Sequence, residues 1–156
     1  MSDMLVKLYD LPPLESVEQF EARTGVTIRR AIAPEKHVVT KWIGEHFSPF
    51  WVSEAEVAFA HAPITCIIAT ENGKMLGFAC YDTTTKGFFG PTGVDEKERG
   101  RGVGKMLLMH TLYLMRQDGY GYAVIGSAGP KDFYAKAVGA VVIEGSEPGI
   151  YKGMLR

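Results

Sequence analysis

Short runs of apolar residues, bounded by glycine, proline or polar turns, follow one another through the middle of this chain. Residues 64–70 and 75–81 are both strand-like, and the turn at 71–74 between them contains an Asn-Gly pair, which is typical of a tight β-hairpin. Residues 87–94 form a third strand-like run, interrupted at Pro91. The pattern therefore predicts three consecutive strands, the first two joined as a hairpin.

Helical patterns flank these strands on both sides. Ser53, which two glutamates follow closely, has the residue type of an N-cap. The longest pattern, residues 102–118, is apolar on nearly all sides, so this helix should be buried. Gly139 is expected to end the last helix, because glycine accepts the left-handed conformation found there. We expect helices over residues 14–23, 33–47, 54–61, 102–118 and 130–138.

The remaining strand-like segments are short. Residues 122–126 follow the long helix, and a strand–helix–strand crossover places them parallel to residues 87–94. Further strands are expected over residues 26–31, 141–144 and 150–155. One α+β domain accounts for all of these elements, because no linker, repeat or low-complexity segment divides the chain.

Composition and charge limit the partners of the chain. Its 156 residues include 17 basic and 18 acidic side chains, so no surface for a polyanion such as nucleic acid is indicated. No apolar run approaches the roughly 20 residues of a membrane span. The first residues also lack the cationic and apolar regions of a secretory leader. We therefore expect neither a nucleic-acid nor a membrane partner.

Cysteine and histidine positions do not suggest a metal centre. Cys66 and Cys80 lie within strand-like segments and are expected to be buried free thiols. The four histidines show no metal-ligand spacing, so we expect no metal. Free thiols and the lack of a leader favour a cytoplasmic location.

The most informative motif is a glycine-rich run between the third strand and the long helix. Alternate glycines let the backbone curl and turn N–H groups inward, and the first helical turn adds N–H groups without intrahelical partners. A concave set of donors at the positive end of a helix binds phosphate. The run consists of Arg99, Gly100, Arg101, Gly102, Val103, Gly104 and Lys105.

Three classes of phosphate-binding loop compete at this position. A Walker loop would place Ser or Thr after its lysine, but Lys105 is followed by methionine. A dinucleotide-binding loop would have glycine where Lys105 stands, and its acidic residue would not lie in a helix-ending turn, as Asp118 does. Arg99, Gly102 and Gly104 instead form R-x-x-G-x-G, which resembles the pyrophosphate-binding motif of the GNAT superfamily of acetyl-CoA-dependent N-acetyltransferases.

The resemblance extends over residues 26–156, whose expected order of strands and helices is similar to that of the GNAT fold. Residues 133–136, Phe-Tyr-Ala-Lys, are similar to the family's F/L-Y-x-K element, although Gly139 follows the tyrosine by five positions where the family usually has four. The resemblance implies an α+β fold with a mixed, mostly antiparallel central sheet flanked by helices. The whole chain, residues 1–156, then forms a single GNAT-like domain with residues 1–25 as an N-terminal extension.

The resemblance implies acetyl-CoA as co-substrate, bound between strands 87–94 and 122–126. Backbone groups of Val94 and Thr92 would contact the pantetheine arm, and the N–H groups of residues 99–105 would hold the pyrophosphate. The proline in the first strand fits a strand that stops pairing with its neighbour; an edge or a bulge would also account for it.

Side chains near the expected cofactor site have more than one interpretation. Arg101 and Lys105 are expected near the phosphates, and Arg99 is expected to hold the loop. All three could instead be solvated loop charges. Ser127 and Phe133 are assigned to the same cofactor site. Ser127 could instead position a water or the substrate, or cap the last helix.

The matching family tyrosine makes Tyr134 the expected general acid for the departing sulfur. The alternative is an aromatic side chain that only packs beside Phe133. The general base is left open, because the strand before the loop carries no carboxylate. Asp82, Glu45 and Glu54 are the remaining candidates.

The acceptor site is less clearly marked. Trp51, Tyr81 and Asp82 are the candidate acceptor contacts, with core packing as the alternative for Trp51 and its aromatic neighbours. Tyr151, near the end of the chain, is a further candidate.

These features predict transfer of acetyl from acetyl-CoA to a primary amine of a small molecule, by direct attack of the amine. Short stretches between residues 129 and 151 are similar to acetyltransferases of amino sugars, so an amino sugar is one candidate acceptor. The missing strand carboxylate favours the alternative of a non-catalytic acyl-CoA-binding or sensing domain. A nucleotide-dependent enzyme is disfavoured by the loop comparison. Small GNAT domains often form dimers, so the resemblance is also compatible with a homodimer.

Overall fold

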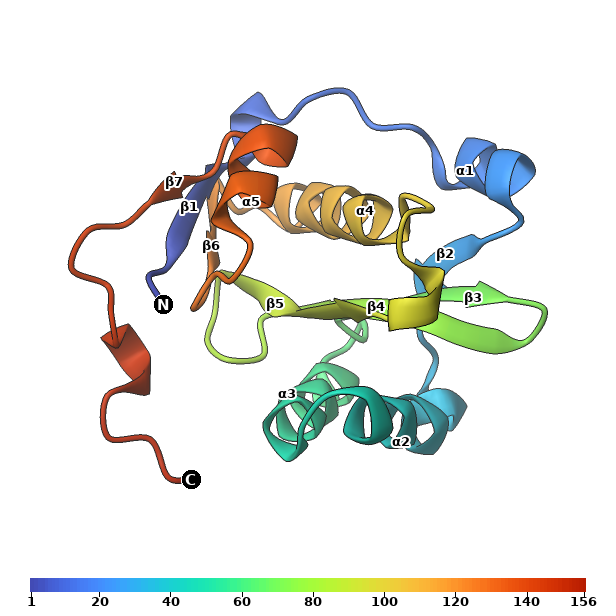
Figure 1. Cartoon of the computed structure of the whole chain (residues 1–156), viewed down its shortest axis with the longest axis horizontal. Helices are drawn as coiled ribbons and strands as arrows, with labels where there is room; N and C mark the ends of the chain where they lie inside the picture. Colours follow the sequence, from blue (N-terminus) through green and yellow to red (C-terminus); the bar gives the residue numbers. More distant parts are fainter.

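The strands form one seven-stranded sheet with helices on both faces (Figure 1). The computed structural model describes all residues from 1 to 156. The strand order is β2-β3-β4-β5-β6-β1-β7, and β5–β6 is the only parallel pair. This arrangement confirms the mixed, mostly antiparallel α+β sheet. The strands are β1 (Met4–Lys7), β2 (Thr27–Arg30), β3 (Cys66–Glu71), β4 (Lys74–Tyr81), β5 (Phe88–Val94), β6 (Tyr122–Ile125) and β7 (Val141–Val142).

Helices α1, α4 and α5 cover one face of the sheet, and α2 and α3 cover the other (Figure 1). Each face has its own hydrophobic core. The α-helices are α1 (Val17–Thr24), α2 (Lys36–His46), α3 (Pro49–Ala60), α4 (Val103–Gln117) and α5 (Lys131–Val138). The 3-10 turns are η1 (Leu8–Asp10), η2 (Ala33–Glu35), η3 (Glu96–Glu98) and η4 (Gly149–Tyr151).

Local sequence signals predict the centre of the chain well. The β3–β4 turn has Asn72 and Gly73 at φ +52° and +75°, the left-handed values that an Asn-Gly turn needs. Helix α4 lies on β4 and β5 with eight buried side chains, as its all-round apolar pattern predicts. Gly139 ends α5 at φ +68°. Cys66 and Cys80 are buried, free and directly opposite each other on β3 and β4.

Strands β5 and β6 pair over only two positions and then part. Phe88 lies opposite Val124 and Phe89 opposite Ile125, and no pairing follows. Gly90 and Pro91 come next on β5, where the register with β4 also shifts and the strand bulges. Both interpretations of the proline therefore hold here: the strand bulges and it stops pairing with its parallel neighbour.

The N-terminal segment, residues 1–25, which is expected from the sequence to be an extension, contributes a strand to the sheet and a helix to its face. Strand β1 lies between β6 and β7, with Met4 opposite both Ile125 and Val142. Helix α1 packs on the α4 face, where Phe20 enters the core. The edge of β6 is thus completed by the beginning of the chain.

Two further boundaries differ from expectation. Helix α3 begins at Pro49 with Ser48 as its N-cap, whose hydroxyl accepts from the Trp51 N–H at 3.4 Å; Ser53 lies inside the helix. Residues 150–155 form η4 and irregular chain in place of a strand, and β7 has only two residues. A terminal strand cannot pair with β6, because β1 already occupies that edge of β6.

Candidate active site

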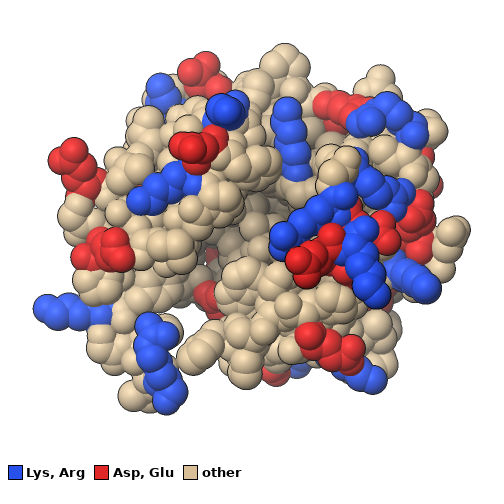
Figure 2. Space-filling model, viewed as in Figure 1, with Lys and Arg blue, Asp and Glu red and all other residues tan.

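A cleft of about 1260 Å³ opens where β5 and β6 part, and it extends from the loop before α4 to α3 and the C-terminal segment. Figure 2 shows this hollow in the middle of the face, with lysine and arginine side chains gathered on the η3–α4 side. Most predicted site residues line the cleft: Trp51, Thr92, Val94, Arg99, Gly100, Gly102, Val103, Gly104, Lys105, Ser127, Phe133 and Tyr134.

The glycine loop presents a row of free donors to this cleft. Gly100 and Gly102 take φ values of +87° and +79°, which side chains rarely adopt. The first α4 hydrogen bond runs from the Met106 N–H to the Gly102 carbonyl at 3.0 Å. None of the backbone N–H groups from Arg99 to Lys105 donates a hydrogen bond within the chain. The arrangement is suited to an anion.

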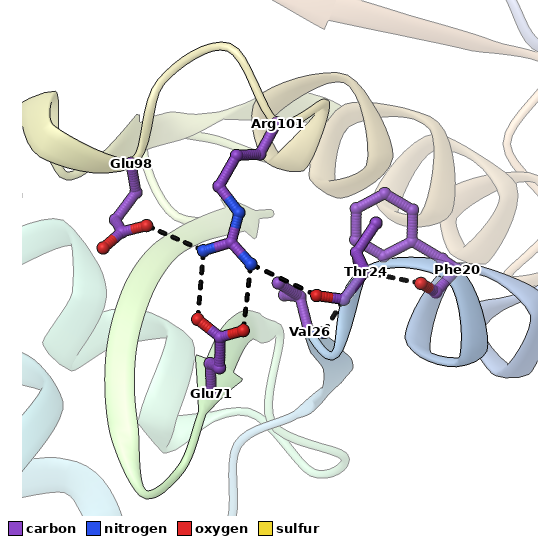
Figure 3. A network of polar contacts seen from close by, with 6 residues as sticks. All are labelled: Phe20, Thr24, Val26, Glu71, Glu98 and Arg101. Carbon is purple, nitrogen blue, oxygen red and sulfur yellow. Dashed lines mark hydrogen bonds and ion pairs between the residues drawn. The ribbon is translucent and has the colours of Figure 1, made fainter.

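The three cations of the loop have different surroundings. The Arg101 guanidinium turns away from the cleft and pairs with Glu71 and Glu98 (Figure 3). It also donates to the Thr24 carbonyl at the end of α1. These carboxylates raise the pKa of Arg101. Arg101, which was expected near the phosphates, therefore has the loop-holding contacts that were expected of Arg99.

Arg99 and Lys105 remain available to a ligand. Both line the cleft, and neither forms an ion pair within the chain. They lie at the two ends of the row of free N–H groups. The charge that can reach an anion in the loop is therefore theirs.

The free edge of β5 also faces the gap. The Asp95 N–H donates to the Leu76 carbonyl of β4 at 2.7 Å. Since N–H groups alternate in direction along a strand, those of Val94 and Thr92 point away from β4, toward the position that β6 has left. The Thr92 hydroxyl is occupied, because it donates to the Phe78 carbonyl at 2.9 Å. Thr92 and Val94 thus offer backbone rather than side-chain contacts.

Helix α5 and the turn before it form the opposite wall. Tyr134 is almost fully buried, and burial raises the pKa of its hydroxyl, which has no hydrogen-bond partner within the chain. Phe133 is partly exposed, with its ring centre 5.4 Å from that of Tyr134. Ser127 is not the α5 N-cap, a position taken by Pro130. The Ser127 N–H instead donates to the buried Asp3 carboxylate at 2.7 Å.

The far end of the cleft is formed by α3 and the loop between β4 and β5. Trp51 both lines the cleft and packs on Phe47, with ring centres 4.7 Å apart, so both of its predicted roles are structurally compatible. Of the candidate bases, Glu54 lies in the cleft, where Thr84 donates to its carboxylate. Burial raises the pKa of Glu54. Glu45 is exposed on α2, outside the cleft, near Lys41.

Tyr81 and Asp82 do not line the cleft, contrary to expectation. Tyr81 is fully buried, and its hydroxyl donates to the Asp118 carboxylate at 2.9 Å. The Asp82 carboxylate accepts from the Gly87 N–H at 2.7 Å and from the Tyr120 hydroxyl at 2.8 Å. Burial and this carboxylate raise the pKa of Tyr120 to about 12. Both residues hold the end of β4 to the region after α4.

Sequence reasoning missed one support of the cleft and part of its lining. Asp3 holds the turn at Ser127, but nothing marks an aspartate in an N-terminal segment as a support for a distant turn. The C-terminal segment contributes Ile150, Tyr151 and Met154 to the lining, and only Tyr151 was a candidate. No group of three or more His, Cys, Asp and Glu side chains lies close enough together to hold a metal ion. None of the helices combines the length and apolar character of a membrane-spanning helix.

Comparison with known proteins agrees with this geometry. The family model of the acetyltransferase (GNAT) family matches residues 31–139, which include both strands of the splay, the glycine loop and Tyr134. The chain belongs to the GNAT family. No curated protein matches the chain by sequence.

Solved structures share the GNAT fold of this chain. The glucosamine N-acetyltransferase region of a fungal multi-domain GH3 β-N-acetylglucosaminidase has a TM-score of 0.73 and 17% identity, over 91% of this chain and 19% of that one. A GCN5-related N-acetyltransferase from Sphaerobacter thermophilus has a TM-score of 0.70 and 23% identity, over 91% of this chain and 48% of that one. A GNAT-family acetyltransferase from Brucella melitensis, in complex with acetyl-CoA, has a TM-score of 0.51 and 20% identity, over 71% of this chain and 80% of that one. The chain spans less than half the length of the first two.

Proposed function

We propose that this chain transfers the acetyl group of acetyl-CoA to a primary amine of a small molecule, by direct attack of the amine. The observation that carries the proposal is one continuous cleft. It connects a row of free backbone N–H groups, from Arg99 to Lys105, with the unpartnered hydroxyl of Tyr134. Membership of the GNAT family supports acetyl transfer as the reaction class.

The residues present fit acetyl-CoA. The free N–H groups, with Arg99 and Lys105 beside them, suit a diphosphate at the positive end of α4. The helix dipole contributes about 0.3–1 kcal/mol to such a contact, so the hydrogen bonds and charges must supply most of the affinity. The backbone groups of Thr92 and Val94 that face the gap suit the amides of a pantetheine arm.

The chemistry divides between the co-substrate and the chain. When bound, acetyl-CoA supplies the thioester, whose carbonyl carbon forms the new C–N bond as its C–S bond breaks. Alkyl ammonium groups titrate near pH 10, so the site must remove a proton from the amine. The Val94 N–H, which points away from β4 into the gap, would donate a hydrogen bond to the thioester carbonyl oxygen. Tyr134 would give its proton to the leaving sulfur, and its raised pKa keeps that proton in place at neutral pH.

The alternative of a non-catalytic acyl-CoA-binding domain loses its main support. That alternative rests on the missing carboxylate of the strand before the loop. Glu54 supplies a carboxylate to the same cleft from α3. A nucleotide-dependent enzyme would need a different phosphate-binding loop. The R-x-x-G-x-G loop matches neither the Walker loop nor the dinucleotide-binding loop.

Two measurements test the proposal. Calorimetric titration should show that the protein binds acetyl-CoA in preference to ATP and NAD. Lys105→Gln should weaken this binding, whereas Lys74→Gln, on the exposed hairpin away from the cleft, should not. A thiol reagent should then detect CoA release with a panel of primary amines. Binding without release would support the sensing domain instead, and preference for ATP or NAD would overturn the proposal.

A further inference from the structure

We infer that Glu54 binds the ammonium group of the acceptor and takes its proton, and that the acceptor is a monoamine with an apolar body. This inference rests on the proposed acetyl transfer and adds the base and the acceptor class to it. It follows from the position of Glu54, from the charges around the cleft and from the character of the walls.

Glu54 lies beside the point where the strands part. Thr84 donates to its carboxylate, and the neighbouring Thr83 donates to the carbonyl of Gly90, at the β5 bulge, at 2.9 Å. Just after β6, a Cβ at Gly126 would lie 2.5 Å from the Tyr151 hydroxyl, and both residues line the same cleft as Glu54. The carboxylate therefore faces the cleft at the splay, where the thioester arm would end.

The charges around the cleft have a simple distribution. Arg99 and Lys105 lie on the glycine-loop side, and the acidic side chains of the lining are Glu54 and Glu98. Glu98 is paired with Arg101 at 2.7 Å, so it is neutralised. Glu54 has no cationic partner within the chain. A single available carboxylate matches a single ammonium group, and Arg156 in the lining opposes a second positive charge on the acceptor.

The walls around this carboxylate are largely apolar. Partly exposed hydrophobic side chains line the cleft from α3 and from the C-terminal segment, which runs from β7 toward the side of the sheet that carries α3 (Figure 1). A sugar would bury several hydroxyl groups against such walls without partners, which is costly. An alkyl or aryl group would gain from the same contact. The apolar lining residues are Phe50, Trp51, Val57, Ile150 and Met154.

The proton transfer balances without another reactant. An N–H bond of the ammonium breaks, an O–H bond forms on Glu54, and the nitrogen lone pair becomes free to attack. Burial raises the pKa of Glu54, which makes the carboxylate a stronger base than an exposed one. The titratable neighbours are Tyr151 and Cys80, and burial raises the pKa of both, so neither competes for the proton at neutral pH.

CoA release with three matched acceptors tests the acceptor class. Phenethylamine presents one amine on an apolar body, glucosamine one amine on a polar body, and spermidine several amines. We expect kcat/KM for phenethylamine to exceed that for the other two by about tenfold or more. A higher value for glucosamine or spermidine would overturn the inference and leave acetyl transfer intact. Acetyl-CoA binding with no release from any amine would overturn both.

Glu54→Gln, with phenethylamine as acceptor, tests the base. Glutamine keeps the size of the side chain and an oxygen that can accept from Thr84. We expect kcat/KM to fall about 10²–10⁴-fold at pH 7. The deficit should shrink about tenfold per pH unit toward the ammonium pKa near 10, because the variant can use only the neutral amine. Glu56→Gln, an exposed glutamate of the same helix, should change neither value. A Glu54→Gln deficit below twofold, or one independent of pH, would overturn the assignment.

Discussion

The Arg101 guanidinium and the Glu71 carboxylate form a two-pronged ion pair, with N–O distances of 3.0 and 2.9 Å (Figure 3). The pair joins the glycine loop to the end of β3, and the pKa of Glu71 is lowered by it. Gly25, after α1, fits against the same carboxylate, because a Cβ there would lie 3.1 Å from a Glu71 oxygen. The loop is thus held in its curled form before any ligand binds, which reduces the ordering cost of binding.

Glu71→Gln should loosen the loop and weaken acetyl-CoA binding. Glutamine cannot form the two-pronged pair with Arg101, so the curled form would be populated for less of the time. Apparent affinity falls in proportion to that population, and we expect a roughly threefold to tenfold higher Kd by calorimetry. Glu15→Gln, which removes an exposed pair with Arg23, is the control. An unchanged Kd for Glu71→Gln would show that the loop keeps its form without the pair.

Gly93→Ala should destabilise the protein through one close contact. A Cβ at Gly93 would lie 2.3 Å from the Phe47 ring, which packs among Trp42, Trp51 and Phe78 and has little freedom to move. Overpacking of this kind costs about 1–3 kcal/mol, measurable by urea unfolding. Combining it with Phe47→Leu should recover part of the loss. If the double variant is less stable than the sum of the single variants predicts, the contact is not the cause.

The elements that the sequence predicts correctly depend on local signals. The Asn-Gly turn at 72–73, the all-round apolar pattern of α4 and the glycines of the loop each reflect a conformational requirement within a few residues. The cleft follows from them, because the loop, α4 and the end of β5 are consecutive in the chain. Eight of the twelve predicted site residues that line the cleft do so for this reason, those between Thr92 and Lys105.

The predictions that fail depend on distant partners. Strand β1 pairs with β6, across more than a hundred residues of sequence, and residues 4–7 contain no signal for that neighbour. Arg99 and Arg101 have the same side chain and nearly the same position. Only Glu71 and Glu98, which the fold brings beside Arg101, decide which arginine turns away from the cleft. Such choices require the three-dimensional arrangement.

Tyr134→Phe should separate catalysis from packing. Phenylalanine keeps the buried ring, and the lost hydroxyl has no hydrogen-bond partner within the chain, so stability should change little. If Tyr134 protonates the leaving sulfur, kcat should fall about 10²–10⁴-fold with the Kd for acetyl-CoA unchanged. Tyr122→Phe, which removes the hydroxyl of an exposed tyrosine outside the cleft, is the control and should leave kcat unchanged. Turnover of Tyr134→Phe near the wild-type rate would leave Tyr134 as a packing residue.

Glu54→Gln should also make the protein more stable at neutral pH. Burial raises the pKa of Glu54 above its ordinary value of 4.5 in the folded state. The folded state then holds this proton more tightly than the unfolded state, so the stability contribution of Glu54 is lost as pH rises from 4.5 through the raised pKa. Glutamine carries no charge to desolvate. The Tm of Glu54→Gln should therefore exceed that of the wild type at pH 8, by about 2–4 °C per kcal/mol of cost removed.

At pH 4 the Tm difference should nearly disappear, because Glu54 is then largely protonated in both states. Glu56→Gln, whose side chain is 51% exposed, should show no such pH-dependent difference. A Tm that falls at pH 8, or that shifts equally at both pH values, would contradict the desolvation argument. A rise in stability together with a loss of turnover would have one cause: a carboxylate held in an apolar cleft at a cost to folding, where a proton acceptor is needed.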